Sequence, residues 1–224
     1  MQKRGRPATF DREEALQRAM ELFWARGYEG ATLDDLQVAM GGITPPSFYH
    51  AFGSKAELFL KAADLYLATI GNPTVRALEE GETAREAVEA MLRLTAESFS
   101  IPGKPHGCLL VLGATNCAPS NKGPQDYLQA IRRRAPEVIE QRLKRAVAEG
   151  ELPSELDAAA MAAFYATIIH GLAVRAGDGA SREALMAAVA GAMAAWDALA
   201  ATANSDLRST QRPVAVTTTR RRRR

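Results

Sequence analysis

Hydroxyl, imidazole and ammonium groups gather in one short stretch of this sequence, and they are suited to binding chemistry. Ser47, Tyr49 and His50 lie within four residues of one another, and Lys55 follows them. Such groups hydrogen-bond to phosphate oxygens and to the edges of bases. These side chains therefore predict contact with nucleic acid, provided that the elements around them hold them on one surface.

The segment before this stretch has the features of a short helix that ends in a sharp turn. Thr32 and Asp35 form a capping-box pattern that starts the helix. Gly41 and Gly42 end it, because paired glycines tolerate positive φ, and Ile43 plugs the corner behind them. A tight turn is the predicted result. The apolar residues expected to pack are Leu33, Leu36, Val38 and Met40.

A second short helix is predicted directly after this turn. Thr44 caps it, and two prolines follow in the first turn, where a missing N–H costs little. Phe48 and Phe52 are spaced four residues apart and should point inward, which leaves the polar side chains outside. Ser54 begins a further helix and places Lys55 at its positive end. Two helices around a glycine turn form the helix-turn-helix pattern, in which the second helix lies in the major groove of DNA.

The sequence resembles the N-terminal domain of TetR-type (AcrR-like) transcriptional regulators, closely over residues 1–65 and elsewhere only in length, helicity and layout. Two features depart from the pattern: Gly41 and Gly42 replace a single glycine, and Pro45 and Pro46 stand where many relatives have Lys-Gly. The resemblance is carried by Phe23, Gly27, Tyr28, Thr32, Leu33, Leu36, Gly42, Ile43, Thr44, Phe48, Tyr49, His50, Phe52, Ser54, Lys55, Leu58 and Phe59.

The resemblance implies an all-α homodimer of two-domain subunits that binds a pseudo-palindromic operator in double-stranded DNA, usually to repress. A basic arm, residues 1–10, either tracks the minor groove or is a solvated tail. The domains expected are residues 11–56 for DNA binding and 57–202 for effector binding and dimerisation, with a basic tail at 203–224. The predicted DNA-binding residues are Arg4, Arg6, Thr32, Thr44, Pro45, Ser47, Tyr49, His50 and Lys55.

Charge and composition are consistent with a cytoplasmic protein that binds DNA through local patches. The formal net charge is +2, but Arg220–Arg224 supply five positive charges, so the rest of the chain sums to −3. No apolar run approaches the roughly 20 residues that span a bilayer, so no membrane contact is expected. The N-terminus also lacks the apolar core of a signal peptide. Cys108 and Cys117 are expected to be free thiols.

The remainder of the chain predicts further helices. The helix after Lys55 should break or bend at Gly71–Pro73, and the helix over 124–149 should kink at Pro136. Ser154 and Ser181 begin two helices dense in Ala and Gly, which predict a four-helix dimer interface or close packing within one subunit. The other segments predicted to be helical are 83–99 and 107–118.

No enzyme motif is found, and no cofactor or metal is expected. The chain lacks a P-loop, a dinucleotide-binding glycine pattern, a nucleophile elbow and a His-Glu-x-x-His helix. His106 next to Gly107-Cys108 suggests either an activated thiol or a buried structural cysteine. His170 lies in an apolar helix, where it faces a ligand cavity or the dimer seam, or is a satisfied core histidine.

A small hydrophobic effector is implied by the resemblance, and its binding should move the linking helix, Leu58–Ile70, and so misplace the recognition helices. Two alternatives remain open: an effector-independent architectural DNA-binding protein, and a small helical ligand carrier or enzyme. The predicted cavity wall consists of Met91, Leu94, Cys108, Leu112, Tyr127 and Phe164, each apolar or large and located in the relevant helices.

Overall fold

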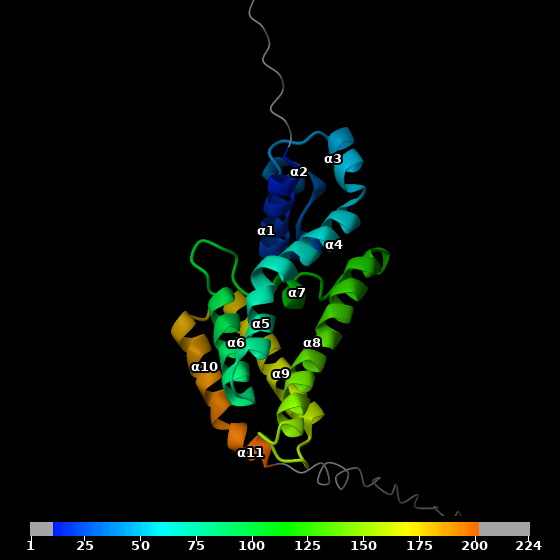
Figure 1. Cartoon of the computed structure of the whole chain (residues 1–224). Helices are drawn as coiled ribbons and strands as arrows, with labels where there is room; N and C mark the ends of the chain where they lie inside the picture. Colours follow the sequence, from blue (N-terminus) through cyan, green and yellow to red (C-terminus); the bar gives the residue numbers. More distant parts are fainter. Residues whose placement is uncertain (1–10, 202–224) are drawn as a thin grey trace, which may run out of the picture.

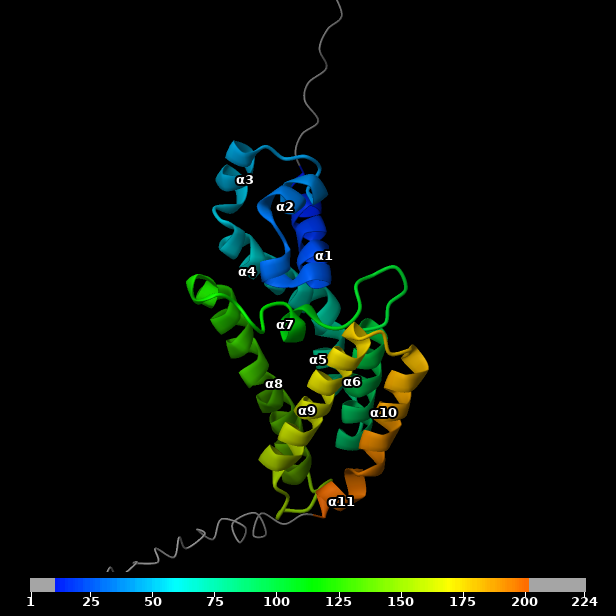
Figure 2. The same ribbon diagram turned by 180° about the vertical axis from the view of Figure 1, so that it is seen from behind.

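The computed structural model describes residues 11–201, and this range is all-α. A small N-terminal unit lies at one end of an elongated molecule, and a larger helical bundle forms the other end (Figure 1). The reverse view shows α8 and α9 side by side, with α10 beyond α6 (Figure 2). The helices are α1 Arg12–Gly30, α2 Leu33–Ala39, α3 Pro45–Phe52, α4 Lys55–Tyr66, α5 Asn72–Glu80, α6 Ala84–Ser98, α7 Leu109–Leu112, α8 Lys122–Ala148, α9 Ala158–Gly177, α10 Arg182–Ala194 and α11 Trp196–Ala200.

Side-chain caps start α1 and α2, whereas Thr44 precedes α3 as predicted but its side chain makes no capping hydrogen bond. The carboxylate of Asp11 accepts hydrogen bonds from the first-turn amides of α1, and Thr32 and Asp35 form the predicted capping box of α2. Gly41 and Gly42 both have positive φ, at 91° and 76°, and Ile43 is buried behind them. The predicted tight turn is therefore confirmed. Val38 was predicted to pack but is 76% exposed, because it lies on the opposite side of α2 from the buried Leu36.

Gly42→Ala is expected to lower the free energy of unfolding by about 1 kcal/mol, because a side chain at φ 76° is strained. An added Cβ at Gly42 would meet no atom within 4 Å, so the cost comes from the backbone alone. Urea denaturation measures this change in the free energy of unfolding. Gly123→Ala in α8 is the matched control, since a Cβ there also meets open space and φ is not positive. Equal effects of the two substitutions would contradict the prediction.

The predicted break or bend at Gly71–Pro73 takes the form of a bend, because the helix continues through this segment. α4 continues into a π-helical segment, Leu67–Gly71, which leads directly into α5. Pro73 lies in the first turn of α5, where its missing N–H is tolerated. α4, the π-helical segment and α5 therefore form one continuous helical rod that is bent between α4 and α5 and runs from the N-terminal unit into the bundle (Figure 1). α4 also spans the predicted domain boundary between residues 56 and 57.

Two predicted helices of the bundle have different bounds in the structure. Only Leu109–Leu112 is helical within the predicted 107–118 segment, because an apolar run without a longer helical period does not specify its own length. α9 begins at Ala158 and not at the predicted Ser154. Its N-cap is Asp157, whose carboxylate accepts a hydrogen bond from the Ala160 amide. α10 begins after Ser181, as predicted.

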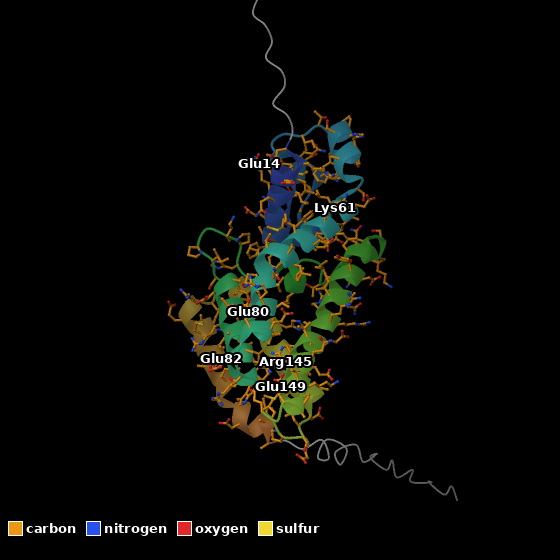
Figure 3. The ribbon with its side chains drawn as sticks, viewed as in Figure 1. Glu14, Lys61, Glu80, Glu82, Arg145 and Glu149 are labelled. Carbon is orange, nitrogen blue, oxygen red and sulfur yellow. The ribbon has the colours of Figure 1, made fainter. Side chains whose placement is uncertain are left out.

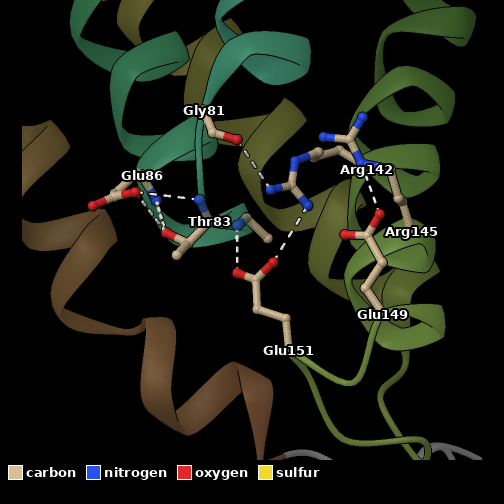
Figure 4. Close-up of polar contacts among 8 residues, drawn as sticks. Gly81, Thr83, Glu86, Arg142, Arg145, Glu149 and Glu151 are labelled. Carbon is tan, nitrogen blue, oxygen red and sulfur yellow. Dashed lines mark hydrogen bonds and ion pairs between the residues drawn. The ribbon is translucent and has the colours of Figure 1, made fainter.

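Charged groups lie mainly on the outside of both units, as the labelled Glu14, Glu80 and Glu149 illustrate (Figure 3). Arg142 of α8 is an exception, because its side chain is buried. It donates a hydrogen bond to the Gly81 carbonyl at 3.4 Å and lies 3.5 Å from the Glu151 carboxylate, which also accepts a hydrogen bond from the Ala84 amide (Figure 4). These contacts join the α5–α6 turn to α8 and to the α8–α9 connection.

Candidate nucleic-acid interface and internal cavity

The third helix, α3, lies at the end of the molecule (Figure 1). One of its faces is polar and exposed to solvent. Phe48 and Phe52 are buried, as predicted, and Tyr49 is 50% exposed. Ser47 and His50 are exposed beside it. This face therefore exposes two hydroxyls and an imidazole to a large flat or grooved partner.

Contacts with α1 fix the position of this polar face. The Arg12 guanidinium donates a hydrogen bond to the Ala51 carbonyl at 3.1 Å and lies 5.6 Å from the centre of the Phe52 ring. At the other end of α3, the Thr44 hydroxyl donates to the Ser47 hydroxyl at 3.0 Å. Thr44 and Pro45 are exposed, so the start of α3 is also open to a partner.

The other predicted DNA-binding residues are not all on this face. Thr32 is exposed, but its hydroxyl is engaged in the capping box of α2, where it donates to Asp35 at 2.7 Å. Lys55 is half-buried, and its ammonium lies 4.4 Å from the centre of the Tyr28 ring. Burial lowers the pKa of Lys55. Arg4 and Arg6 lie outside the described residues.

Lys55→Ala is expected to lower the free energy of unfolding by about 0.5–1 kcal/mol, because it removes the cation from the face of the Tyr28 ring. Operator affinity should also fall, since a positive charge is lost at the start of α4. Thermal unfolding and filter binding measure the two effects. Lys61→Ala on α4 is the control for a lost lysine charge. An unchanged operator affinity for Lys55→Ala would exclude Lys55 from the interface.

A cavity of about 330 Å³ lies within the bundle. Its walls come from the α4–π–α5 rod and from α6, α7, α8 and α9, and most of the lining side chains are apolar. A concave apolar space of this size is typical of small-molecule sites. The apolar walls include Leu67, Ile70, Val75, Leu78, Phe99, Leu110, Val111, Ile131, Val138, Ile139 and Ile169.

Two of the six predicted wall residues, Met91 and Cys108, line this cavity, and the other four do not. Leu94 is 36% exposed on α6. Leu112 faces a smaller pocket at the junction of the two units, and Phe164 packs edge-on against Tyr165, with ring centres 5.1 Å apart. The Tyr127 hydroxyl donates a hydrogen bond to the Asp64 carboxylate between α8 and α4. Large apolar character alone did not identify which side of each helix faces inward.

The polar residues of the cavity wall were not among the predicted wall residues. They include Tyr66, Arg132 and His170. Burial lowers the pKa of His170, so this imidazole is neutral at pH 7. For His170 the sequence did give a signal. Its place in an apolar helix predicted a ligand cavity as one of three alternatives, beside the dimer seam and the core.

Cys108 lines the cavity as a buried thiol. Burial raises the pKa of Cys108, and this outweighs the hydrogen bonds from the Val111 amide, the Tyr66 hydroxyl and the Leu110 amide, which act in the opposite direction. The activated-thiol hypothesis therefore has no support from the electrostatics of the site, and the buried-cysteine alternative does. Within the described residues no group of three metal-binding side chains occurs.

A strip of the bundle, residues 107–121, connects the cavity to the N-terminal unit. Its residues Cys108, Leu110 and Val111 line the cavity. The same strip bonds to α1: the Trp24 indole donates to the Gly107 carbonyl at 3.0 Å, and the Tyr28 amide donates to the Gly113 carbonyl at 2.6 Å. Further along, the Ala118 amide and the Asn121 side chain donate to the Glu29 carboxylate at 2.8 and 2.9 Å.

Two adjoining helices leave small apolar residues uncovered in the single subunit. By length and composition, Ala158–Gly177 and Arg182–Ala200 are apolar enough to cross a membrane, yet only 39% and 28% of their apolar windows are buried. An added Cβ at Gly171 or Gly191 meets no atom within 4 Å. These faces are open and smooth, which suits close helix packing by another copy. Their exposed residues include Ala163, Thr167, Gly171, Val174, Ala184, Ala187, Ala188, Gly191 and Ala194.

Two family profiles match this chain, one for each unit. Residues 15–62 match the profile described as bacterial regulatory proteins, tetR family. Residues 84–192 match the tetracyclin repressor-like C-terminal domain. Together they cover more than half of the sequence.

Individual proteins are similar over nearly the whole chain. The HTH-type transcriptional repressor ComR of Escherichia coli (strain K12) is 31% identical over 197 residues, which is 88% of this chain and 93% of ComR. The repressor BdcR of the same organism is 29% identical over 83% of this chain and 89% of its own length. Among solved structures, a cysteine mutant of the TetR family regulator CifR, complexed with 26-bp double-stranded operator DNA, is 44% identical with a TM-score of 0.82. This structural match covers 86% of this chain and 100% of the CifR chain.

Proposed function

The chain belongs to the TetR family of bacterial regulatory proteins and is a DNA-binding transcriptional repressor, and we propose that a small hydrophobic effector in its cavity releases it from its operator. The family is not enzymatic. The observation that carries the proposal is the α4–π–α5 rod, which begins next to α3 and lines the cavity through Tyr66, Ile70 and Val75.

We propose that two subunits bind a pseudo-palindromic operator in double-stranded DNA, with each α3 in the major groove. The solved complex of CifR with 26-bp double-stranded operator DNA supports operator binding, since CifR has a similar fold. The exposed face of α3 supports it further, because Ser47, Tyr49 and His50 share that face. The uncovered faces of α9 and α10 would join the subunits into a four-helix interface.

Release follows from a shift between two arrangements of the rod. A ligand that fills the cavity displaces the walls formed by the π-helical segment and by the strip 107–121. Both elements contact the N-terminal unit, the first through α4 and the second through hydrogen bonds to Trp24, Tyr28 and Glu29. The two α3 helices then leave the spacing of about one DNA turn that adjacent major grooves require. A π-helical segment is a common location for such a change.

We place residues 11–56 in the DNA-binding domain and 57–202 in the effector-binding and dimerisation domain, with α4 joining them. A repressor of bacterial transcription acts on chromosomal DNA, which places the protein in the cytoplasm. The uncovered apolar helices α9 and α10 are accordingly assigned to subunit contact and not to a membrane.

A gel-shift experiment with the protein's own upstream DNA at two salt concentrations tests the function. We expect specific retention of this DNA that resists an excess of unlabelled DNA of unrelated sequence. A steep loss with salt and no sequence preference would instead indicate an effector-independent architectural protein. Complete absence of retention would indicate a ligand carrier. A thermal-shift screen of small hydrophobic compounds tests the effector part, because ligands that bind the folded state raise the melting temperature.

A further inference from the structure

The charge on the cavity wall is of one sign. Arg132 and Arg134 line the cavity, and no aspartate or glutamate does so. The guanidinium of Arg132 donates a hydrogen bond to the Leu110 carbonyl at 2.8 Å, and within residues 11–201 it forms no ion pair. Its side chain is half-buried. A partly desolvated cation without a counter-charge is unfavourable, and an anion in the cavity would relieve that cost.

A buried hydroxyl lies in the wall of the same cavity. Tyr66 is 1% exposed and lines the cavity, and its hydroxyl, which has almost no accessible surface, makes no hydrogen bond of ordinary geometry among the described residues. Its polar neighbours are the Cys108 thiol, which is a weak hydrogen-bonding group, and the Leu109 amide. Buried polar groups in folded proteins are nearly always well paired, so an oxygen acceptor on a ligand that displaces the Cys108 side chain would satisfy this hydroxyl better.

The rest of the wall sets the shape and polarity of the ligand. Aliphatic and aromatic side chains dominate it, and a volume of about 330 Å³ is at the small end of the range for ligand pockets. His170 is neutral at pH 7, so it adds no charge to the two arginines. A suitable ligand is therefore compact, largely apolar and anionic at one end.

We propose that the effector is a hydrophobic carboxylate, whose apolar body lies among the aliphatic walls and whose carboxylate pairs with Arg132 and accepts a hydrogen bond from Tyr66. This inference rests on the proposed function and deepens it by naming the chemical class of the effector. Arginine suits the role because its planar guanidinium binds a carboxylate through two parallel hydrogen bonds.

Isothermal titration of the full-length protein with four probes built on a ten-carbon chain tests the charge requirement. The probes are decanoate, methyl decanoate, 1-decanol and decylamine, which share the apolar chain and differ in the head group. Decanoate is expected to bind at least about tenfold more tightly than the ester or the alcohol, because a hydrogen bond to a charged group is stronger than one to a neutral group. Decylamine, which is cationic at pH 7, is expected not to bind.

Matched variants locate the head group. Arg132→Met should weaken decanoate binding by roughly tenfold to a hundredfold and leave 1-decanol unaffected. Arg133→Met is its control, because Arg133 is the exposed neighbour and does not line the cavity. Tyr66→Phe should weaken decanoate binding roughly fivefold to tenfold. Tyr165→Phe is its control, since the Tyr165 hydroxyl is also buried and unpaired but lies outside the cavity wall.

Three outcomes overturn this proposal. The first is equal affinity for decanoate and 1-decanol, and the second is no binding of decanoate or of its eight- and twelve-carbon homologues. The third is an equal loss of affinity for decanoate and 1-decanol in Arg132→Met, which would show a general collapse of the cavity. Operator binding is measured on the same samples, so these failures are separate from a failure of the DNA-binding function itself.

Discussion

Replacement of both Gly171 and Gly191 by arginine is expected to convert the protein into a monomer and to reduce operator affinity by roughly 10²–10⁴-fold. Neither new side chain meets another atom of its own subunit at the Cβ position. Each substitution also replaces glycine with a good helix former, which favours α9 and α10 by about 0.5–1 kcal/mol. If the protein functions as a single subunit, the variant should therefore be at least as stable as the unmodified protein.

Operator affinity is lost only if a second copy of the protein packs on the α9 and α10 faces. Two arginines from each subunit would then be forced into a close-packed apolar interface without partners, which strongly opposes association. One subunit then holds only one half-site, and the gain from binding two linked sites disappears. Light scattering measures the mass in solution, and a gel shift measures operator affinity.

A pair of arginines on α8 provides the control for added charge. Gln129→Arg with Gln141→Arg introduces the same two cations at exposed positions that lie off the α9 and α10 faces. This variant should remain dimeric and bind the operator at least as well as the unmodified protein. If the Gly171 and Gly191 variant keeps its dimeric mass, the proposed interface is wrong.

Tyr49→Ala is expected to weaken operator binding by roughly tenfold to a hundredfold, because a tyrosine hydroxyl that donates to phosphate forms a charge-assisted hydrogen bond. The loss should be similar for all DNA sequences, since a phosphate contact carries no base information. Tyr49 is half-exposed, so its removal leaves the core of the N-terminal unit in place. Fluorescence anisotropy with specific and unrelated duplexes measures both affinities.

Leu94→Ala is the control for this substitution. It removes another exposed large side chain, but from α6 in the bundle. Operator affinity should be unaffected by it, and circular dichroism should show the same helix content in both variants. Unchanged affinity in Tyr49→Ala would remove Tyr49 from the interface, and a loss confined to one duplex sequence would reassign it to base contact.

The sequence by itself determined the N-terminal unit in detail. Thr32 and Asp35 specify the start of α2, and the positive φ of Gly41 and Gly42 specifies the turn. The four-residue spacing of Phe48 and Phe52 decides which face of α3 is buried. These signals act within one or two turns of chain, so they are readable without knowledge of distant contacts.

Only the tertiary structure decided which residues form the cavity. Its walls come from helices that are far apart in sequence, and the rotation of each helix about its axis is fixed by all its neighbours together. Tyr66 and Arg132 line the same cavity although 66 positions separate them in the chain, and Leu94 and Phe164 lie outside its wall. No local pattern encodes such a convergence, because side-chain size and polarity do not specify the direction in which a packed helix points them.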